Sequence, residues 1–314
     1  MENPKASTLG YHWLDNQLKN PEKYLLNYEN SLPTNIKGLD SVLHGLIEGQ
    51  LYILAARPAE GKTTLVLNII LRTLKNLKDN EIVIFLSLEM SATEILSRIL
   101  KIVNSYNIGM DIKELAAKKR LLIIDYSHSN VKNIKKIIEE EQKNKIVKSI
   151  FIDHLQLLET DNPNLPRYEK MTQITRELKI VARETHTNVF AISQLSRDVE
   201  RRTQRDSNTE IQLSDLRDSG SIEQDADVVL FLYKPKMRND KNGYKVENTN
   251  QYVIQIGKNR NGPTTSISCL LFQKNCLFKF KEDFPIKQIK ENNKNDYEKQ
   301  NYVADDENDG LAWE

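Results

Sequence analysis

The residues with the most specific chemistry form a short loop between an apolar run and a helical pattern. Residues 57–64, with the sequence RPAEGKTT, follow the apolar run Leu51–Ala55. In such a setting backbone N–H groups and the helix N-terminus attract phosphate, a lysine reaches the terminal phosphates, and a hydroxyl ligates Mg²⁺. We therefore predict a phosphate-binding loop for Mg-ATP or a related triphosphate, with Lys62 on the phosphates and Thr63 on the metal. The loop residues expected to contact the nucleotide are Ala59, Glu60, Gly61, Lys62, Thr63 and Thr64.

A second metal ligand is expected at the end of another apolar run. Hydrolysis on such a loop needs a carboxylate that holds Mg²⁺ beside the loop hydroxyl. Two apolar runs end in aspartate, at Asp125 and at Asp153. We assign the metal to Asp153, because the apolar stretch that follows it places it at the edge of a buried layer. Asp125 precedes a polar turn and is interpreted as an ordinary acid at a strand end.

Two further polar residues follow apolar runs of strand length. Glu89 follows Ile84–Leu88 and is the candidate general base. We expect its strand next to the strand that precedes the loop, because connections are short. The alternative for Glu89 is an acid stabilised by a helix N-terminus. Gln194 follows Val189–Ser193 and could hydrogen-bond the γ-phosphate and report its loss. The alternative for Gln194 is a group that only caps a loop.

These side chains need a sheet that brings strand ends together. Apolar runs alternate with helical patterns over residues 32–284, which predicts an α/β fold with a twisted, mostly parallel central sheet flanked by helices. The predicted strands are Leu51–Ala55, Ile82–Leu88, Leu121–Asp125, Ser149–Asp153, Val189–Ser193, Val228–Tyr233, Tyr252–Gly257 and Ser266–Phe272. The predicted helices are Lys62–Leu77, Thr93–Val103, Val131–Lys143 and Glu169–Thr185. Ser91 and Glu94 have the spacing of a capping box at the start of the second helix.

The composition is that of a folded protein in a reducing compartment. The chain has 314 residues, 39% of them hydrophobic and 28% charged. No apolar run approaches the roughly 20 residues of a membrane-spanning helix, and no secretory signal is visible at the start. Cys269 and Cys276 lack a neighbouring histidine at metal-ligand spacing, so neither a zinc site nor a disulfide framework is indicated. We expect a cytoplasmic location and no membrane contact.

The charge balance bears on nucleic-acid binding. Lysine and arginine number 45 against 44 aspartates and glutamates, so any nucleic-acid contact must be local.

We expect three segments: an amphipathic arm or linker helix at 1–31, one globular domain at 32–284, and a disordered acidic tail at 285–314. The tail, with Trp313, is either a docking peptide or a solvated end.

Six strings in order resemble the DnaB family of replicative helicases, from about Leu32 to Phe280. They are AARPAEGKTT (55–64), FLSLEMS (85–91), FIDHLQLL (151–158), ISQLSR (192–197), SDLRDSGSIEQDAD (214–227) and KNRNGPT (258–264). The resemblance implies a RecA-like P-loop NTPase. It also accounts for Ala56, which replaces the first glycine of the general loop pattern and is common in this family.

The resemblance implies a role for each matched residue. Lys62 and Thr63 would bind phosphate and Mg²⁺, Glu89 would be the catalytic base, Asp153 the metal carboxylate and Gln194 the sensor. Two further matches concern the nucleotide. Arg98 would lie near it, while Lys258 and Arg260 would reach the ATP site of a neighbouring subunit, so that active sites lie between subunits. Without the family, Lys258 and Arg260 could equally be solvated charges at a strand end.

The resemblance also implies a DNA-facing loop. Arg217, Asp218 and Gly220 lie on the matching segment, where a positive side chain and backbone N–H groups can follow phosphates. The family has glutamate at the position of Asp218, which is a departure. No aromatic residue interrupts the loop, so we expect binding to the backbone of single-stranded DNA without reading of its sequence.

The function implied is an ATP-dependent replicative helicase motor that translocates 5′ to 3′ on single-stranded DNA. The expected partners are single-stranded DNA, copies of the chain in a hexameric ring, and a helicase loader or primase. Family members carry an N-terminal helical domain, whereas about thirty residues precede the motor here. The richness in lysine and asparagine suits a phage or mobile element of a low-GC host.

Two alternatives remain open on the sequence. One is a RadA-like recombination ATPase that moves on DNA without replicative unwinding; the absence of a zinc ribbon argues against it. The other is a helicase-like subunit that binds and regulates a host helicase. A purely regulatory subunit could have lost its own ATPase activity. The intact set of Lys62, Glu89, Asp153 and Arg260 argues against such a loss.

Overall fold

The structure is a computed structural model that describes residues 28–105, 117–162, 164–195, 211–216, 219–235 and 250–284. The expected arm lies outside these residues except for residues 28–31, and the tail lies wholly outside them. The division of the chain into arm, motor and tail therefore stays a prediction. None of the helices in the described ranges has the length and apolarity that crossing a membrane requires.

A nine-stranded sheet forms the centre of the described part of the chain, in the order β3-β2-β4-β5-β1-β6-β7-β8-β9. Strands β1 to β6 run parallel, and β7, β8 and β9 extend the sheet beyond β6, each antiparallel to the strand before it. The strands are β1 (Leu51–Ala56), β2 (Glu81–Ser87), β3 (Leu121–Asp125), β4 (Ile146–Asp153), β5 (Asn188–Gln194), β6 (Val228–Tyr233), β7 (Gln251–Asn259), β8 (Ser266–Phe272) and β9 (Leu277–Phe280).

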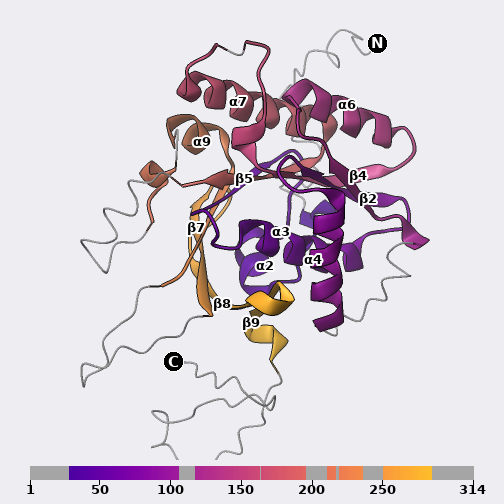
Figure 1. Cartoon of the computed structure of the whole chain (residues 1–314), viewed down its shortest axis with the longest axis vertical. Coiled ribbons are helices and arrows are strands. Elements are labelled where there is room, and N and C mark those ends of the chain that lie inside the picture. Colours follow the sequence, from indigo (N-terminus) through magenta and orange to yellow (C-terminus); the bar gives the residue numbers. More distant parts are fainter. Residues whose placement is uncertain are drawn as a thin grey trace, which may run out of the picture.

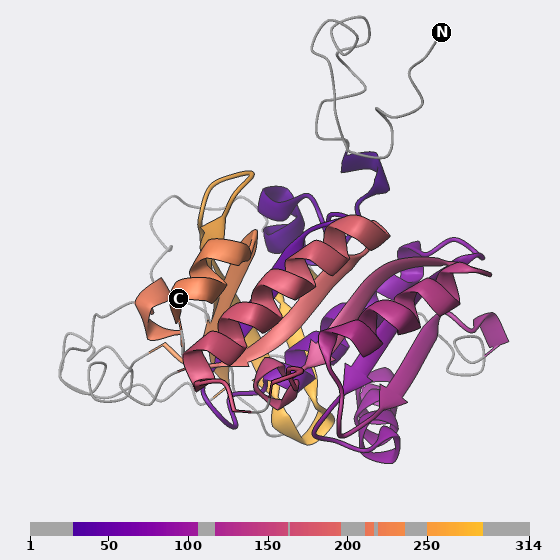
Figure 2. The same ribbon diagram turned by 90° about the horizontal axis from the view of Figure 1, so that it is seen from above.

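Helices cover both faces of the sheet (Figure 1). One face carries α2 (Lys37–Leu43), α3 (Lys62–Thr73) and α4 (Ala92–Ser105), and the other carries α6 (Val131–Gln142), α7 (Arg167–Thr185) and α9 (Ser219–Asp225). Figure 2 shows α6 and α7 side by side over one face of the sheet. Burial on both sides explains why the inner strands are apolar at nearly every position: all six residues of β1 and all seven of β2 are buried.

Each strand supplies alternate residues to two separate cores. Tyr52, Leu54 and Ala56 of β1 pack with α3 and α4, whereas Leu51, Ile53 and Ala55 pack with α6, α7 and α9. This alternation follows from the two-residue period of a strand. The sheet is therefore held from both sides. The carboxyl ends of its parallel strands all lie along one side of the sheet, here called its carboxyl edge.

The α/β fold with a mostly parallel sheet is confirmed, and all eight predicted strands and four predicted helices are present. The first helix is shorter than predicted, because α3 ends at Thr73 and a 3₁₀ turn continues over Leu74–Asn76. Besides short 3₁₀ turns, two α-helices and one strand in the described ranges were not predicted: α2, α9 and β9. One prediction was wrong, since β4 and β5 lie between β2 and β1, so the strand before Glu89 is not next to the strand before the loop.

Candidate functional site

The phosphate-binding loop joins β1 to α3 through two residues with left-handed backbone. Ala59 has φ 64° and Gly61 has φ 83°. Gly61 is also the residue that precedes the first turn of α3, and a Cβ added there would lie 3.3 Å from a methyl group of Leu271. A side chain at Gly61 would therefore meet both an unfavourable φ and a tight contact. The glycine keeps the backbone N–H groups of the helix start open to a ligand.

Lys62 folds back across the loop that it follows. Its Nζ donates to the carbonyl oxygens of Arg57, at 2.9 Å, and Ala56, at 3.3 Å. Burial lowers the pKa of Lys62 below its usual value, and the negative charges of Asp153, Glu89 and Glu60 oppose that shift. The lysine is thus held at the loop by carbonyl groups, with three carboxylates near enough to favour its charge, which is where a phosphate would need a cation.

Asp153 brings a carboxylate to the first turn of α3. The Thr63 hydroxyl donates to Asp153 Oδ2 at 2.5 Å, and Asp153 is 2% exposed. Thr64, the next residue, is also buried, with its carbonyl oxygen accepting from Asn68. A hydroxyl and a carboxylate are the hard oxygen donors that Mg²⁺ prefers, so this pair fits a magnesium ion.

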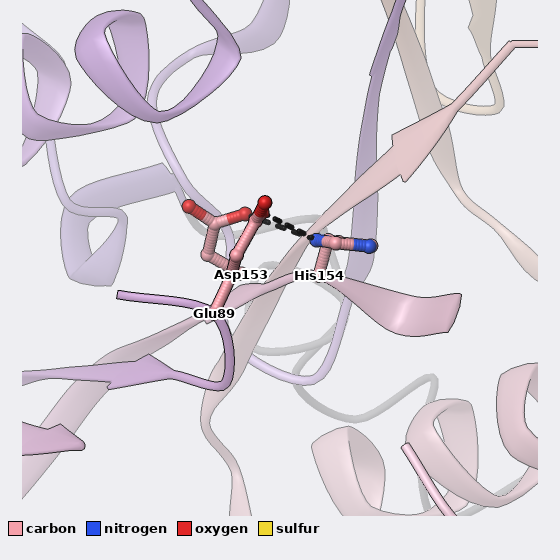
Figure 3. A group of neighbouring side chains, drawn as sticks. All are labelled: Glu89, Asp153 and His154. Carbon is pink, nitrogen blue, oxygen red and sulfur yellow. Dashed lines mark ion pairs between the residues drawn. The ribbon is translucent and has the colours of Figure 1, made fainter. Parts of the chain in front are cut away.

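Glu89 also lies close to Asp153, although β4 and β5 separate its strand, β2, from β1. Ser87 lies beside Asp153 in the parallel register of β2 and β4, so the residue two positions further along extends beyond the edge. Glu89, Asp153 and His154 each offer a ligand atom, and these atoms lie within 4.8 Å of one another. In Figure 3 the two carboxylates approach the same side of the His154 ring. The Glu89 side chain is 61% exposed, which leaves it accessible to water.

Gln194 ends β5 directly beside the loop. It is the register partner of Ala56, the last residue of β1. Its side-chain amide nitrogen lies 3.3 Å from His154 Nε2. The structure therefore brings Gln194, Glu89, Asp153 and the loop together at the carboxyl edge of the sheet.

Two other predicted positions lie away from this cluster. Asp125 Oδ2 accepts from the Ala92 backbone N–H at 2.8 Å and so stabilises the start of α4, in line with an ordinary structural acid. Arg98 lies half-buried on α4, where its charge is a minor contribution to a lowered pKa of Glu94 whose main cause is hydrogen bonding from Ser91. Within the described ranges, Arg98 forms no hydrogen bond or ion pair with the loop.

Lys258 does not extend into solvent. Its Nζ donates to the carbonyl oxygens of Glu223 and, at 2.6 Å, of Ala226, at the C-terminal end of α9. Burial lowers the pKa of Lys258, with a further contribution from the positive charge of Arg260. A cation at helix carbonyls is a favourable pairing. The alternative of a solvated charge is therefore wrong for Lys258.

Arg260 follows β7 and binds the same helix end. Its guanidinium donates to the carbonyl oxygen of Gln224 and lies 3.5 Å from Asp227 Oδ1. The Arg260 side chain is 46% exposed, so part of the guanidinium remains at the surface. The neighbouring Lys258 and Arg260 thus share α9 as an anchor.

The Lys258–Arg260 pair and the phosphate-binding loop lie at opposite ends of the sheet's strands. Asn259 is opposite Val228, the first residue of β6, and Val228 lies beside Tyr52 near the start of β1. The loop begins only after Ala56, four residues further along β1, or about 13 Å away at about 3.3 Å a residue. The chain's own Arg260 is therefore far from its own loop.

Gly220 lies in the first turn of α9, not on a loop as predicted. A Cβ added there would lie 3.2 Å from the hydroxyl of Tyr168, an aromatic residue of α7 that is 55% exposed. Arg217 and Asp218 lie outside the described residues. Leu216, just before them, forms an isolated antiparallel bridge with Leu195, which follows Gln194.

Sequence reasoning missed His154 and Asp227. His154 is 5% exposed and contacts both Glu89 and Gln194. Asp227, also 5% exposed, accepts from the N–H of Leu51. The available signal was the same for both: a titratable residue directly beside a buried strand.

Comparison with known proteins gives a consistent result. The family described as DnaB-like helicase C terminal domain matches residues 31–282. The replicative DNA helicase DnaB of Mycoplasma genitalium is 36% identical over 257 residues, which cover 76% of this chain and 54% of the relative. The chain thus spans about half the length of such curated relatives.

Two solved structures resemble the fold. One, described as an ATPase domain, has a TM-score of 0.70 and 30% identity, and the alignment covers 85% of this chain and 98% of that one. A DnaB-like replicative helicase, described with its interactions with primase, has a TM-score of 0.68 and 29% identity, covering 85% and 67%. The sheet is therefore that of a RecA-like ATPase domain, and neither the recombination ATPase nor the regulatory subunit is favoured. The chain belongs to the family of DnaB-like helicase C-terminal domains.

Proposed function

We propose that the chain is the motor of an ATP-dependent replicative DNA helicase, with residues 32–284 as the motor domain. The observation that carries the proposal is the contact of the Thr63 hydroxyl with Asp153 at the carboxyl edge of the sheet. Glu89 and Gln194 lie at the same edge. A loop, a metal carboxylate, a base and a polar sensor at one sheet edge are what nucleotide hydrolysis requires.

The proposed chemistry assigns each side chain one task. The loop N–H groups of residues 59–64 and the Lys62 ammonium hold the phosphates, and Thr63 and Asp153 would hold Mg²⁺. When bound, Mg²⁺ supplies charge neutralisation at the phosphate oxygens. Glu89 takes the proton of the attacking water on its exposed carboxylate, and Gln194 donates an amide N–H to the γ-phosphate. Arg98 is retained as a nucleotide contact on the resemblance alone.

The active site of this proposal is completed by a second subunit. Lys258 and Arg260 lie at the edge of the sheet away from their own loop, and Arg260 remains partly exposed. A head-to-tail arrangement of copies would place one subunit's Arg260 near the next subunit's phosphates, where a guanidinium stabilises developing charge. Such an arrangement forms a ring where the rotation between neighbouring subunits closes, and we propose a ring of six subunits.

DNA binding is proposed for the segment that precedes α9. Arg217, Asp218 and Gly220 would follow the phosphates of single-stranded DNA, with 5′ to 3′ movement as the family implies. The primase named for one structural neighbour makes a primase, or a helicase loader, a reasonable partner to test. The bacterial relatives suit a cytoplasmic site of action.

The test is a paired assay of ATP hydrolysis and fork unwinding with the full chain. The wild type should hydrolyse Mg-ATP faster with single-stranded DNA and should displace a labelled strand. Asp153→Asn should lower kcat by about a hundredfold or more, because it removes the metal carboxylate. Asp125→Asn is the matched control and should retain hydrolysis, since Asp125 only caps α4. DNA-stimulated hydrolysis without strand displacement would count against the helicase assignment.

A further inference from the structure

His154 lies between the proposed base and the proposed sensor. Its Nδ1 is 3.3 Å from Glu89 Oε2, and its Nε2 is 3.3 Å from the side-chain nitrogen of Gln194. The ring is buried, with 7% of its side chain exposed, and Figure 3 shows it beside the Glu89 and Asp153 carboxylates. One ring therefore touches two residues that come from β5 and from the end of β2.

Hydrogen-bond roles follow from the partners. The carboxylate of Glu89 carries no proton, so a proton on Nδ1 is the arrangement that makes their 3.3 Å contact favourable. A neutral ring then leaves Nε2 as an acceptor for an N–H of Gln194. The amide nitrogen of Gln194 has two hydrogens, so one can bind His154 while the other donates to a phosphate oxygen. Both contacts are thus satisfied by one arrangement of protons.

The same chain of contacts continues toward the DNA segment. Gln194 precedes Leu195, which bridges Leu216, and Leu216 immediately precedes Arg217 of that segment. A shift of the segment on binding DNA would therefore move the end of β5 and, with it, the Gln194 amide. His154 is the described side chain that contacts both Gln194 and Glu89, so such a movement would reach Glu89 through it.

We propose that His154 is a positioning residue that couples DNA binding to hydrolysis, by linking the orientation of the base Glu89 to Gln194. The inference rests on the proposed function. Misplacing a catalytic group by about 1 Å can cost about a hundredfold in rate, so a single ring that fixes both groups is sufficient to make hydrolysis depend on DNA.

Two substitutions of His154 separate its two contacts. His154→Phe fills a similar space and removes both the polar contact with Glu89 and the hydrogen bond with Gln194. His154→Asn places an amide nitrogen near the position of Nδ1, so it keeps the donor to Glu89 but is too short to reach Gln194. The matched control is His128→Phe, because His128 also pairs with a carboxylate, that of Glu159 at 3.1 Å, but is 78% exposed and follows β3, which lies four places from β1 in the sheet.

The experiment measures hydrolysis with and without single-stranded DNA, together with the affinity for a fluorescent ATP analogue. For His154→Phe we expect affinity within about twofold of the wild type and a kcat with DNA lowered by about tenfold to a hundredfold. His154→Asn should keep more of the DNA-free rate than His154→Phe yet lose the stimulation by DNA. His128→Phe should match the wild type in all three measurements.

A double-mutant cycle with Gln194→Ala supplies the decisive outcome. If His154 acts through Gln194, adding Gln194→Ala to His154→Phe should cause little further loss of DNA stimulation. Full stimulation in His154→Phe, or losses that simply multiply in the double variant, would overturn the coupling role while leaving the ATPase assignment intact. A wild-type chain that hydrolyses no ATP would instead overturn both proposals.

Discussion

Asp227 is a single carboxylate that joins three parts of the molecule. Its Oδ2 accepts from the Leu51 N–H at 2.8 Å and from Lys179 Nζ at 2.6 Å, and its Oδ1 faces the Arg260 guanidinium. The start of β1, the middle of α7 and the proposed intersubunit arginine therefore share one buried acceptor. Such a group is stable only while its partners are present.

We predict that Asp227→Asn lowers the free energy of unfolding by about 2 to 3 kcal/mol, because it leaves Lys179 without its carboxylate in a mostly buried setting. Urea unfolding followed by circular dichroism measures the change. Asp79→Asn is the matched control, since Asp79 pairs with Arg120 but is 99% exposed, and it should unfold like the wild type. Equal midpoints for Asp227→Asn and the wild type would contradict this account of Asp227.

At this scale the sequence predicts residues that stand at strand ends and fails for those defined by their neighbours. The ends of β1, β4 and β5 were recognisable from apolar runs, and the loop, Asp153 and Gln194 followed from them. The role proposed for His154 depends on Gln194, 40 positions away in the chain, and the buried setting of Asp227 includes Leu51, 176 positions away. Nothing local in the sequence specifies those partners.

A bulge in β7 determines which face of the sheet Lys258 occupies. The register with β6 shifts between Val229 and Leu230, so that Leu230 is opposite Ile256 and Val229 is opposite Lys258, with Gly257 as the extra residue. Ile256 packs with the α3 core, and strict alternation would put Lys258 on that same face. The bulge instead puts Lys258 on the face of α9, whose carbonyl groups it binds.

Gly257 is needed at the bulge because the ring of Phe231 occupies the space of a side chain. A Cβ added at Gly257 would lie 2.3 Å from Phe231 Cε2. We expect Gly257→Ala to lower the free energy of unfolding by about 2 kcal/mol through overpacking. The measurement is chemical unfolding of Gly257→Ala, Phe231→Leu and the double variant. Since Phe231→Leu shortens the obstructing ring, the double variant should lose less than the sum of the two single losses. An additive result would place the strain elsewhere.

At the scale of elements, prediction succeeded for long segments and failed for strand order and short segments. Strands buried on both faces are recognisable as apolar runs, and α7, with 19 residues, shows a full helical pattern. The order of strands depends on crossovers: β1 connects through α3 to β2, and β4 and β5 later occupy the space between them. α9 and β9, with seven and four residues, are too short for a period to be visible.

The described part of the molecule carries one half of the proposed active site at each end of its parallel strands. The loop, Asp153, Glu89 and Gln194 lie at the carboxyl edge of the parallel strands, and Lys258 and Arg260 lie at the other edge, against α9. Two surfaces that differ within one chain can meet only head to tail, which produces a ring or a filament and not a twofold dimer. If hydrolysis needs both half-sites, each active site contains residues from two subunits.

Mixing two inactive variants tests this arrangement directly. Lys62→Ala removes the phosphate lysine and keeps Arg260, whereas Arg260→Ala keeps the loop intact. Each variant alone should hydrolyse ATP at least about tenfold more slowly than the wild type, because every interface lacks one group. In a mixed ring, a Lys62→Ala subunit that presents its Arg260 to the loop of an Arg260→Ala subunit recreates a complete site. Hydrolysis should therefore rise on mixing and be highest near equal amounts.

A double variant mixed with Arg260→Ala is the control, since no interface of that mixture is complete. If the two single variants assemble together but remain as slow as each one alone, Arg260 does not act across the interface. Recovery on mixing would instead require that the loop and Arg260 of one site come from different chains, as their positions at opposite edges of the sheet imply.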